Sequence, residues 1–248
     1  MSEPESMTFW DHIDELRKRL LRSLVFIALA AIAGFALSDP AQKFLIKPFT
    51  EYVPGSLTLL APSEGFVIQI KISLMLGALF AAPFVAWQLY GFVGPGLKKK
   101  EKLWLWPITI VGTILFWGGV LFAWYVIPGA LKFLGSFAEF GIENLWSLKS
   151  YINLLLFLLL AFGTIFQLPL VMGVLIATGL VSSKFFRKHR RYAIVAIFIL
   201  SALATPTTDA VTMLLMVTPM MFLYEASIWV GVLIEGKRAR RLALEESS

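Results

Sequence analysis

The residues with the clearest chemical potential lie in a charged stretch, Asp11–Leu20, which reads D-H-I-D-E-L-R-K-R-L. This stretch places three carboxylates, one imidazole and three cations just before the first long apolar segment. A stretch of this kind can anchor and orient a membrane protein, or it can dock a charged ligand. We expect docking, with Glu101 as a partner of Glu15 on the same membrane face.

Glu15 and Glu101 are the candidate binding carboxylates, because each adjoins an apolar segment. Two such groups could accept two guanidinium groups through bidentate, charge-assisted hydrogen bonds. A simpler interpretation stays open. Asp14–Lys18 and Glu15–Arg19 are i,i+4 pairs in the favoured order, each worth about 0.2–0.5 kcal/mol, and would form a solvated, self-paired helix. Glu101 lies among four lysines, where a salt bridge within the loop is the ordinary role.

The composition indicates that membrane-spanning segments must position these carboxylates. Of the 248 residues, 58% are apolar and 15% are charged, and the mean hydropathy is +0.78. Soluble domains are about 45–50% apolar, so the chain is predicted to be a polytopic membrane protein. The absence of cysteine excludes disulfides and thiolate sites, and two histidines do not suggest a His-rich metal site. No catalytic motif is present. We therefore predict no enzyme activity, no metal and no cofactor.

Six apolar runs predict an all-α fold with six transmembrane helices, in one membrane domain over residues 1–248. The runs cover about 22–37, 66–93, 103–127, 151–180, 193–204 and 210–234. Residues 1–21 are predicted to form a cytoplasmic helix with Thr8 as N-cap, and 235–248 a charged tail. Segments 38–64 and 128–150 are predicted to be loops.

Two of these runs have unusual features. Pro169 is predicted to kink the fourth helix. The fifth run has only 12 residues, which reach about 18 Å against a hydrocarbon core of about 30 Å. The turn of the short fifth–sixth hairpin therefore lies below the outer surface, or the bilayer is thinner there.

Positive charges predict the orientation. Of the 22 lysines and arginines, 17 lie within 17–22, 98–102, 184–191 and 237–241. These four segments fall on one side of a six-helix topology, so the positive-inside rule places both termini in the cytoplasm. The net charge of +6 is thereby assigned to membrane orientation rather than to nucleic-acid binding.

Within the predicted membrane region four polar residues stand out: Lys71, Gln167, Asp209 and Glu225. Ionisable groups at membrane depth are costly and often functional. Lys71 can also snorkel, Asp209 can cap a helix, and Gln167 can satisfy backbone groups freed at the kink. Glu225 lies about 14 Å from the inner end of its run and is expected to face protein or to be protonated. A proton-coupled small-solute transporter using Asp209 and Glu225 is the alternative function, and a structural scaffold is a third. The absence of an internal repeat weakens the transporter.

A set of motifs follows in order along the six runs. They are H-I-D-E-L-R-K-R-L at 12–20, K-P-F at 47–49, Q-I-K-I-S at 69–73, A-P-F at 82–84, Q-L-Y-G-F-V-G-P-G-L at 88–97, K-K-E at 99–101, F-A-W-Y at 122–125, A-F-G-T-I-F-Q-L-P at 161–169, R-K-H-R-R-Y at 187–192, T-P-T-T-D at 205–209 and Y-E-A-S at 224–227. Over nearly its whole length the chain thereby resembles the TatC family, the large subunit of the twin-arginine protein translocase.

The resemblance implies a function and site residues. TatC-family proteins recognise twin-arginine signal peptides of folded proteins on the cytoplasmic side of a bacterial-type inner membrane. They assemble with small single-span subunits of the TatA and TatB type and use the proton-motive force. The family role implies that Glu15 and Glu101 hold the arginine pair, with Arg17 and Phe92 nearby.

The resemblance also implies roles outside the peptide site. Pro48 belongs to an outer cap and Asp209 to the fifth–sixth hairpin. Partner helices lie along runs five and six, in an oligomeric assembly surrounded by lipid. At Gln167 the family often has Glu. A role that needs a buried carboxylate there is therefore not expected, although hydrogen bonding remains possible for an amide.

Overall fold

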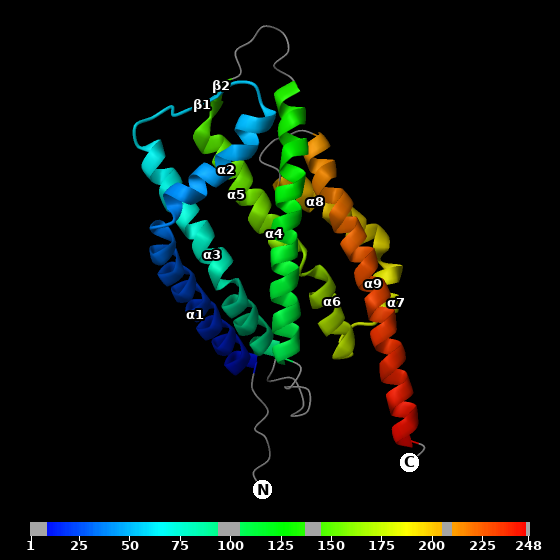
Figure 1. The fold of residues 1–248 in the computed structure, drawn as a ribbon. Coiled ribbons are helices and arrows are strands. Elements are labelled where there is room, and N and C mark those ends of the chain that lie inside the picture. Colours follow the sequence, from blue (N-terminus) through cyan, green and yellow to red (C-terminus); the bar gives the residue numbers. More distant parts are fainter. Residues whose placement is uncertain (1–8, 94–104, 137–144, 205–209, 247–248) are drawn as a thin grey trace. The chain divides into compact units, whose positions relative to one another are not determined.

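The computed structural model describes residues 9–93, 105–136, 145–204 and 210–246 (Figure 1). These residues are mostly helical. The helices are α1 (Phe9–Phe35), α2 (Ser38–Tyr52), α3 (Glu64–Val93), α4 (Leu105–Ser136), α5 (Leu148–Ile165), α6 (Leu168–Ala177), α7 (Ser183–Lys188), α8 (Arg190–Ala204) and α9 (Ala210–Glu246). Two short strands, β1 (Ser56–Thr58) and β2 (Leu145–Ser147), complete the described elements.

The described residues form two compact units. The first contains the chain up to Lys43 together with Gly65–Thr113, and the second contains Phe44–Glu64 and the chain from Ile114 onward. The single membrane domain over 1–248 stays a prediction.

In the first unit, α1 and α3 approach so closely that their backbones touch. A Cβ atom on Gly77 of α3 would lie 2.7 Å from the Ala31 nitrogen and 2.7 Å from the Ile27 carbonyl oxygen of α1. Ala81, one turn further along α3, is fully buried. Small residues four apart let membrane helices approach each other in this way. The contact fixes the register of α1 against α3.

Helix α2 corrects the prediction of a loop over 38–64. The chain bends by 84° after Phe35 and continues as a helix from Ser38. Pro40 lies in the first turn, where the missing N–H has no intrahelical partner in any case. Pro48 lies inside α2 and is buried. Proline content alone therefore did not decide between loop and helix here.

An aromatic cluster joins α2 to the start of α5 in the second unit. Phe49 is buried, and its ring makes edge contacts with the rings of Trp146 and Tyr151, with centroids 5.4 Å away in both cases. The Tyr151 hydroxyl donates to the Leu45 carbonyl oxygen at 2.7 Å. Beside this cluster β1 pairs with β2 in parallel, with Ser56 opposite Leu145. This small sheet departs from the all-α prediction.

The Tyr151→Phe substitution is expected to lower stability by about 1 kcal/mol, because the buried Leu45 carbonyl loses a donor while the aromatic packing is kept. For a chain of this size that corresponds to a fall of roughly 2–4 °C in the unfolding midpoint in detergent. Tyr125→Phe is the matched control, because Tyr125 is 82% exposed. Equal midpoints for the two variants would show that the Tyr151 hydrogen bond does not stabilise the protein.

The remainder of the second unit is built around α9, which packs against α6, α7 and α8. Buried residues from α6, α8 and α9 form one core: Met172, Ile197, Val217, Met220, Tyr224 and Ile228. Helix α8 begins at Arg190, three residues before the predicted run, and has 15 residues. At about 22 Å it is still shorter than a hydrocarbon core.

The predicted interruption near Pro169 is confirmed: α5 ends at Ile165 and α6 begins at Leu168. The Gln167 backbone N–H donates to the Thr164 carbonyl. It therefore does not donate to the Gly163 carbonyl, one turn back. The Gln167 side chain donates to that Gly163 carbonyl instead, at 3.4 Å. Gln167 thus satisfies a backbone group freed by the interruption, as the sequence suggested.

By length and apolarity, four stretches of the described residues could cross a membrane: Glu64–Phe92, Trp106–Ser136, Leu148–Ala177 and Met213–Gly236. A fifth is obtained when the bent pair α1 and α2 is counted as one span. The count of six stays a prediction. Two boundaries are corrected, because α4 continues through Pro128 to Ser136 and α9 continues as a helix to Glu246.

Candidate functional site

The site is built on the i,i+4 spacing of Glu15 and Arg19, which places both on one face of α1. Arg19 donates to the Oε1 atom of Glu15 from Nε at 2.9 Å and from Nη2 at 2.6 Å. Both side chains are mostly buried, with 21% of Glu15 and 24% of Arg19 exposed. Asp14 and Lys18, the other predicted pair, are exposed. The ion pair is therefore part of a packed surface rather than a solvated one.

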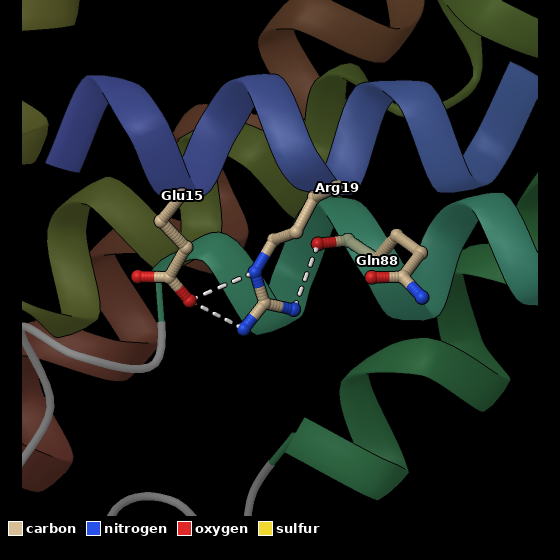
Figure 2. A network of polar contacts seen from close by, with 3 residues as sticks. All are labelled: Glu15, Arg19 and Gln88. Carbon is tan, nitrogen blue, oxygen red and sulfur yellow. Dashed lines mark hydrogen bonds and ion pairs between the residues drawn. The ribbon is translucent and has the colours of Figure 1, made fainter. Parts of the chain in front are cut away.

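Helix α3 supplies the other side of the site (Figure 2). The Nη1 atom of Arg19 donates to the Gln88 backbone carbonyl at 3.4 Å. One turn further, Gly91 gives the guanidinium room, since a Cβ there would lie 2.3 Å from Nη1. Phe92 is half-buried and shares the face of α3 that carries Gln88, because the two residues are four apart. The structure thus brings Glu15 to the end of α3 that carries Phe92.

The second oxygen of Glu15, Oε2, is buried and has no hydrogen-bond partner among the described residues. Buried polar atoms are nearly always paired, because an unpaired one has lost its water without a replacement. A donor that reaches Oε2 would therefore gain a strong hydrogen bond. A guanidinium suits this place, because it is a permanent cation with several N–H donors in one plane.

The structure does not gather the other predicted site residues around Glu15. Arg17 is exposed and lies about 200° around α1 from Glu15, so the two side chains do not share a face. Glu101 and Asp209 lie outside the described residues. Lys71 is half-buried in α3, and Pro48 is buried in α2 beside the aromatic cluster.

Glu225 is half-buried and forms an ion pair. Its Oε2 atom accepts from Nη2 of Arg190 at 2.5 Å, which joins α9 to the start of α8. The neighbouring Tyr224 hydroxyl donates to the Phe186 carbonyl at 2.8 Å and so joins α9 to α7. Both side chains of the ion pair are about two-fifths exposed. Glu225 thus has a partner with an evident structural role.

Sequence reasoning missed the three residues that surround Glu15. The sequence presents Arg19 only as a helix-surface partner of Glu15, and no pattern in it marks Gln88 or Gly91 as site residues. The i,i+4 spacing was the available signal for Arg19. The contact of Arg19 with α3 depends on tertiary packing and has no local pattern. Within the described ranges, no three His, Cys, Asp or Glu side chains gather to hold a metal ion.

Comparisons with known proteins agree on one family. The family model described as "Sec-independent protein translocase protein (TatC)" matches residues 11–219. The Sec-independent protein translocase protein TatC of Carboxydothermus hydrogenoformans is 34% identical over 236 residues, which cover 95% of this chain and 97% of the relative. The chloroplastic TATC protein of Arabidopsis thaliana is also 34% identical, over 93% of this chain and 68% of the relative. A crystal structure of a twin arginine translocase receptor, TatC, superposes with a TM-score of 0.82 at 35% identity, over 90% of this chain and 99% of the other.

Proposed function

This chain belongs to the TatC family of Sec-independent protein translocase proteins, and from that premise we propose that it binds twin-arginine signal peptides. The solved relative is described as a twin arginine translocase receptor, which supports the proposal. In the proposed function the chain receives the signal peptides of folded proteins at the cytoplasmic face. It then serves as the platform on which the translocase assembles, with export driven by the proton-motive force.

The observation that carries the proposal is the Glu15 carboxylate between α1 and α3, with Oε2 buried and without a partner among the described residues. A twin-arginine peptide offers two guanidinium groups followed by an apolar stretch. Glu15 would accept from one guanidinium, and we assign the second to Glu101, which lies outside the described residues. Phe92 offers an apolar surface one turn from Gln88. Arg17, on the far face of α1, would act through the surface charge and not by contact with the bound arginine.

The proposal includes a membrane arrangement. Six spans, with both termini in the cytoplasm, agree with the four clusters of cations along the sequence. The membrane would be a bacterial-type inner membrane. Single-span subunits of the TatA and TatB type would associate along α8 and α9, in an oligomeric assembly. The short α8 and the Asp209 turn would leave the outer side concave or the bilayer thinner. Pro48 and the aromatic cluster would form a rigid outer cap, while Lys71, Gln167 and Glu225 would stabilise the bundle.

Binding of fluorescent signal peptides to the detergent-solubilised protein tests the receptor function. We expect the Arg-Arg peptide to bind at least about tenfold more tightly than a matched Lys-Lys peptide. Lysine keeps the charge but has no planar fork of donors. A tenfold difference is about 1.4 kcal/mol, close to the lower end of the roughly 1.5–3 kcal/mol that one hydrogen bond to a charged group contributes. Equal affinities would show that the protein reads only charge and apolarity, and would contradict a twin-arginine receptor.

The alternative of a proton-coupled transporter gains no support from the geometry. It requires Glu225 as a proton carrier, and the structure gives Glu225 an arginine partner. Solute uptake by the purified protein in vesicles, lost in Glu225→Gln, would be needed to revive this alternative.

A further inference from the structure

We propose that Arg19 is a positioning residue of the peptide site: it holds the Glu15 carboxylate so that Oε2, and not Oε1, receives the incoming guanidinium. This inference rests on the proposed receptor function and adds to it the residue that sets the preference for arginine over lysine. Arg19 belongs to the chain itself and remains in place when the peptide binds.

The contact geometry around Glu15 is asymmetric. Two donors of Arg19, Nε and Nη2, converge on the single atom Oε1. A side-on arginine–carboxylate pair would use both oxygens in parallel hydrogen bonds. Here Oε2 receives none from the described residues, although it is buried. In Figure 2, Oε2 points away from the guanidinium. Arg19 therefore satisfies one oxygen and leaves the other for a second donor.

A second anchor on α3 keeps the guanidinium in this orientation. Nη1 of Arg19 donates to the Gln88 carbonyl at 3.4 Å, so the planar group is held by α1 and α3 together. Gly91 borders the guanidinium so closely that an added Cβ would lie 2.3 Å from Nη1 and 3.2 Å from Cζ. The absence of a side chain at Gly91 is thus a condition for the position of Arg19.

The charge on Arg19 should make the Glu15 site selective for arginine over lysine. Arg19 compensates much of the charge on Glu15, so a cation gains little at this site from charge alone. A ligand gains mainly by donating to Oε2 in the plane that Arg19 fixes. A guanidinium has donors in a fixed plane, whereas an ammonium group is a compact and strongly hydrated charge. Arg19 should therefore contribute to the Arg-Arg preference and much less to the binding of a Lys-Lys peptide.

The test compares two variants. One replaces the guanidinium of Arg19, and the other fills the space that the guanidinium occupies. Arg19→Lys keeps the charge on α1 but cannot bond Oε1 and the Gln88 carbonyl with one planar group. Gly91→Ala keeps Arg19 but occupies its place. We expect each variant to weaken binding of the Arg-Arg peptide about tenfold and to change binding of the Lys-Lys peptide less than about twofold. Gly65→Ala is the matched control in the same helix, since a Cβ there meets nothing within 4 Å.

A double-mutant cycle separates positioning from a general effect on the fold. If Arg19 acts through Glu15, then Arg19→Lys should have no further effect on the Arg-Arg affinity in a Glu15→Ala background. The inference is overturned if Arg19→Lys lowers both peptide affinities equally, or lowers the Arg-Arg affinity by the same factor with and without Glu15. It is also overturned if Arg19→Lys and Gly91→Ala keep the wild-type preference for the Arg-Arg peptide while thermal unfolding shows that both variants are folded.

The same measurements distinguish failure of this inference from failure of the receptor function. A wild-type protein that binds the two peptides equally would contradict the receptor function, and the inference with it. A wild-type preference that depends on Glu15 but survives both Arg19→Lys and Gly91→Ala would leave the receptor function standing and remove only the role of Arg19.

Discussion

The Glu15→Ala substitution is expected to reduce the affinity for an Arg-Arg signal peptide about 10- to 100-fold. Hydrogen bonds to charged groups contribute about 1.5–3 kcal/mol, and each 1.4 kcal/mol is a factor of ten in affinity. The loss should be large because Oε2 of Glu15 is already buried without a partner among the described residues, so the peptide supplies a bond that nothing else replaces. Titration of a labelled Arg-Arg peptide against the purified variant measures this loss of affinity.

Two comparisons make this result specific to Glu15. Asp14→Ala removes a neighbouring exposed carboxylate from the same helix and should leave the affinity within about twofold, because exposed charges are well screened. The Lys-Lys peptide should bind the Glu15→Ala variant and the wild type similarly. A Glu15→Ala protein that retains the full Arg-Arg preference would remove Glu15 from the site.

The Gly77→Ala substitution should have the largest effect on stability, at about 2 kcal/mol. The new methyl group would lie 2.7 Å from backbone atoms of Ala31 and Ile27, and a backbone cannot move aside as a flexible side chain can. We expect the unfolding midpoint to fall by roughly 4–8 °C. Because this contact sets the register of α1 against α3, the variant should also bind the Arg-Arg peptide more weakly, although Gly77 is remote in sequence from Glu15.

Gly129→Ala is the control for Gly77→Ala. Gly129 also lies inside a long helix, α4, but a Cβ there meets nothing within 4 Å. Alanine is the better helix former by about 1 kcal/mol, so this variant should be as stable as the wild type or slightly more stable. If both variants melt at the wild-type temperature, the close packing of α1 on α3 does not limit stability.

The sequence predicted well what depends on local patterns. The apolar runs located α3, α4, α8 and α9 to within a few residues at most ends, and Pro169 located the interruption between α5 and α6. The spacing of Glu15 and Arg19 predicted their ion pair, which the structure confirms. Each of these features depends on residues within about one helical turn, or on a proline whose effect is local.

The features that sequence reasoning missed depend on distant residues. Pro40 and Pro48 give the sequence of α2 the pattern of a loop. Pro40 lies in the first turn, where no intrahelical N–H is lost, and Pro48 is packed in the core. The pairing of Ser56 with Leu145 joins two segments that no local pattern connects. The position of Arg19 against Gln88 and Gly91 likewise follows from the close approach of α1 and α3 at Gly77.

One packing contact between α1 and α3 prepares the proposed site for the peptide. Gly77 allows α1 to lie directly against α3, and this register places Arg19 beside Gly91. Arg19 then holds Glu15 with one oxygen left for a ligand.

Photo-crosslinking tests the central claim, that a twin-arginine peptide binds beside Glu15, most directly. A benzophenone amino acid would replace Leu16, which adjoins Glu15 and is 40% exposed. The control position is Ile32, which is 73% exposed and lies about 24 Å further along the same helix, α1. We predict that the Arg-Arg peptide crosslinks from position 16 and not from 32, and that unlabelled Arg-Arg peptide competes while Lys-Lys peptide does not. Equal crosslinking from both positions, or equal competition by both peptides, would contradict a twin-arginine site at Glu15.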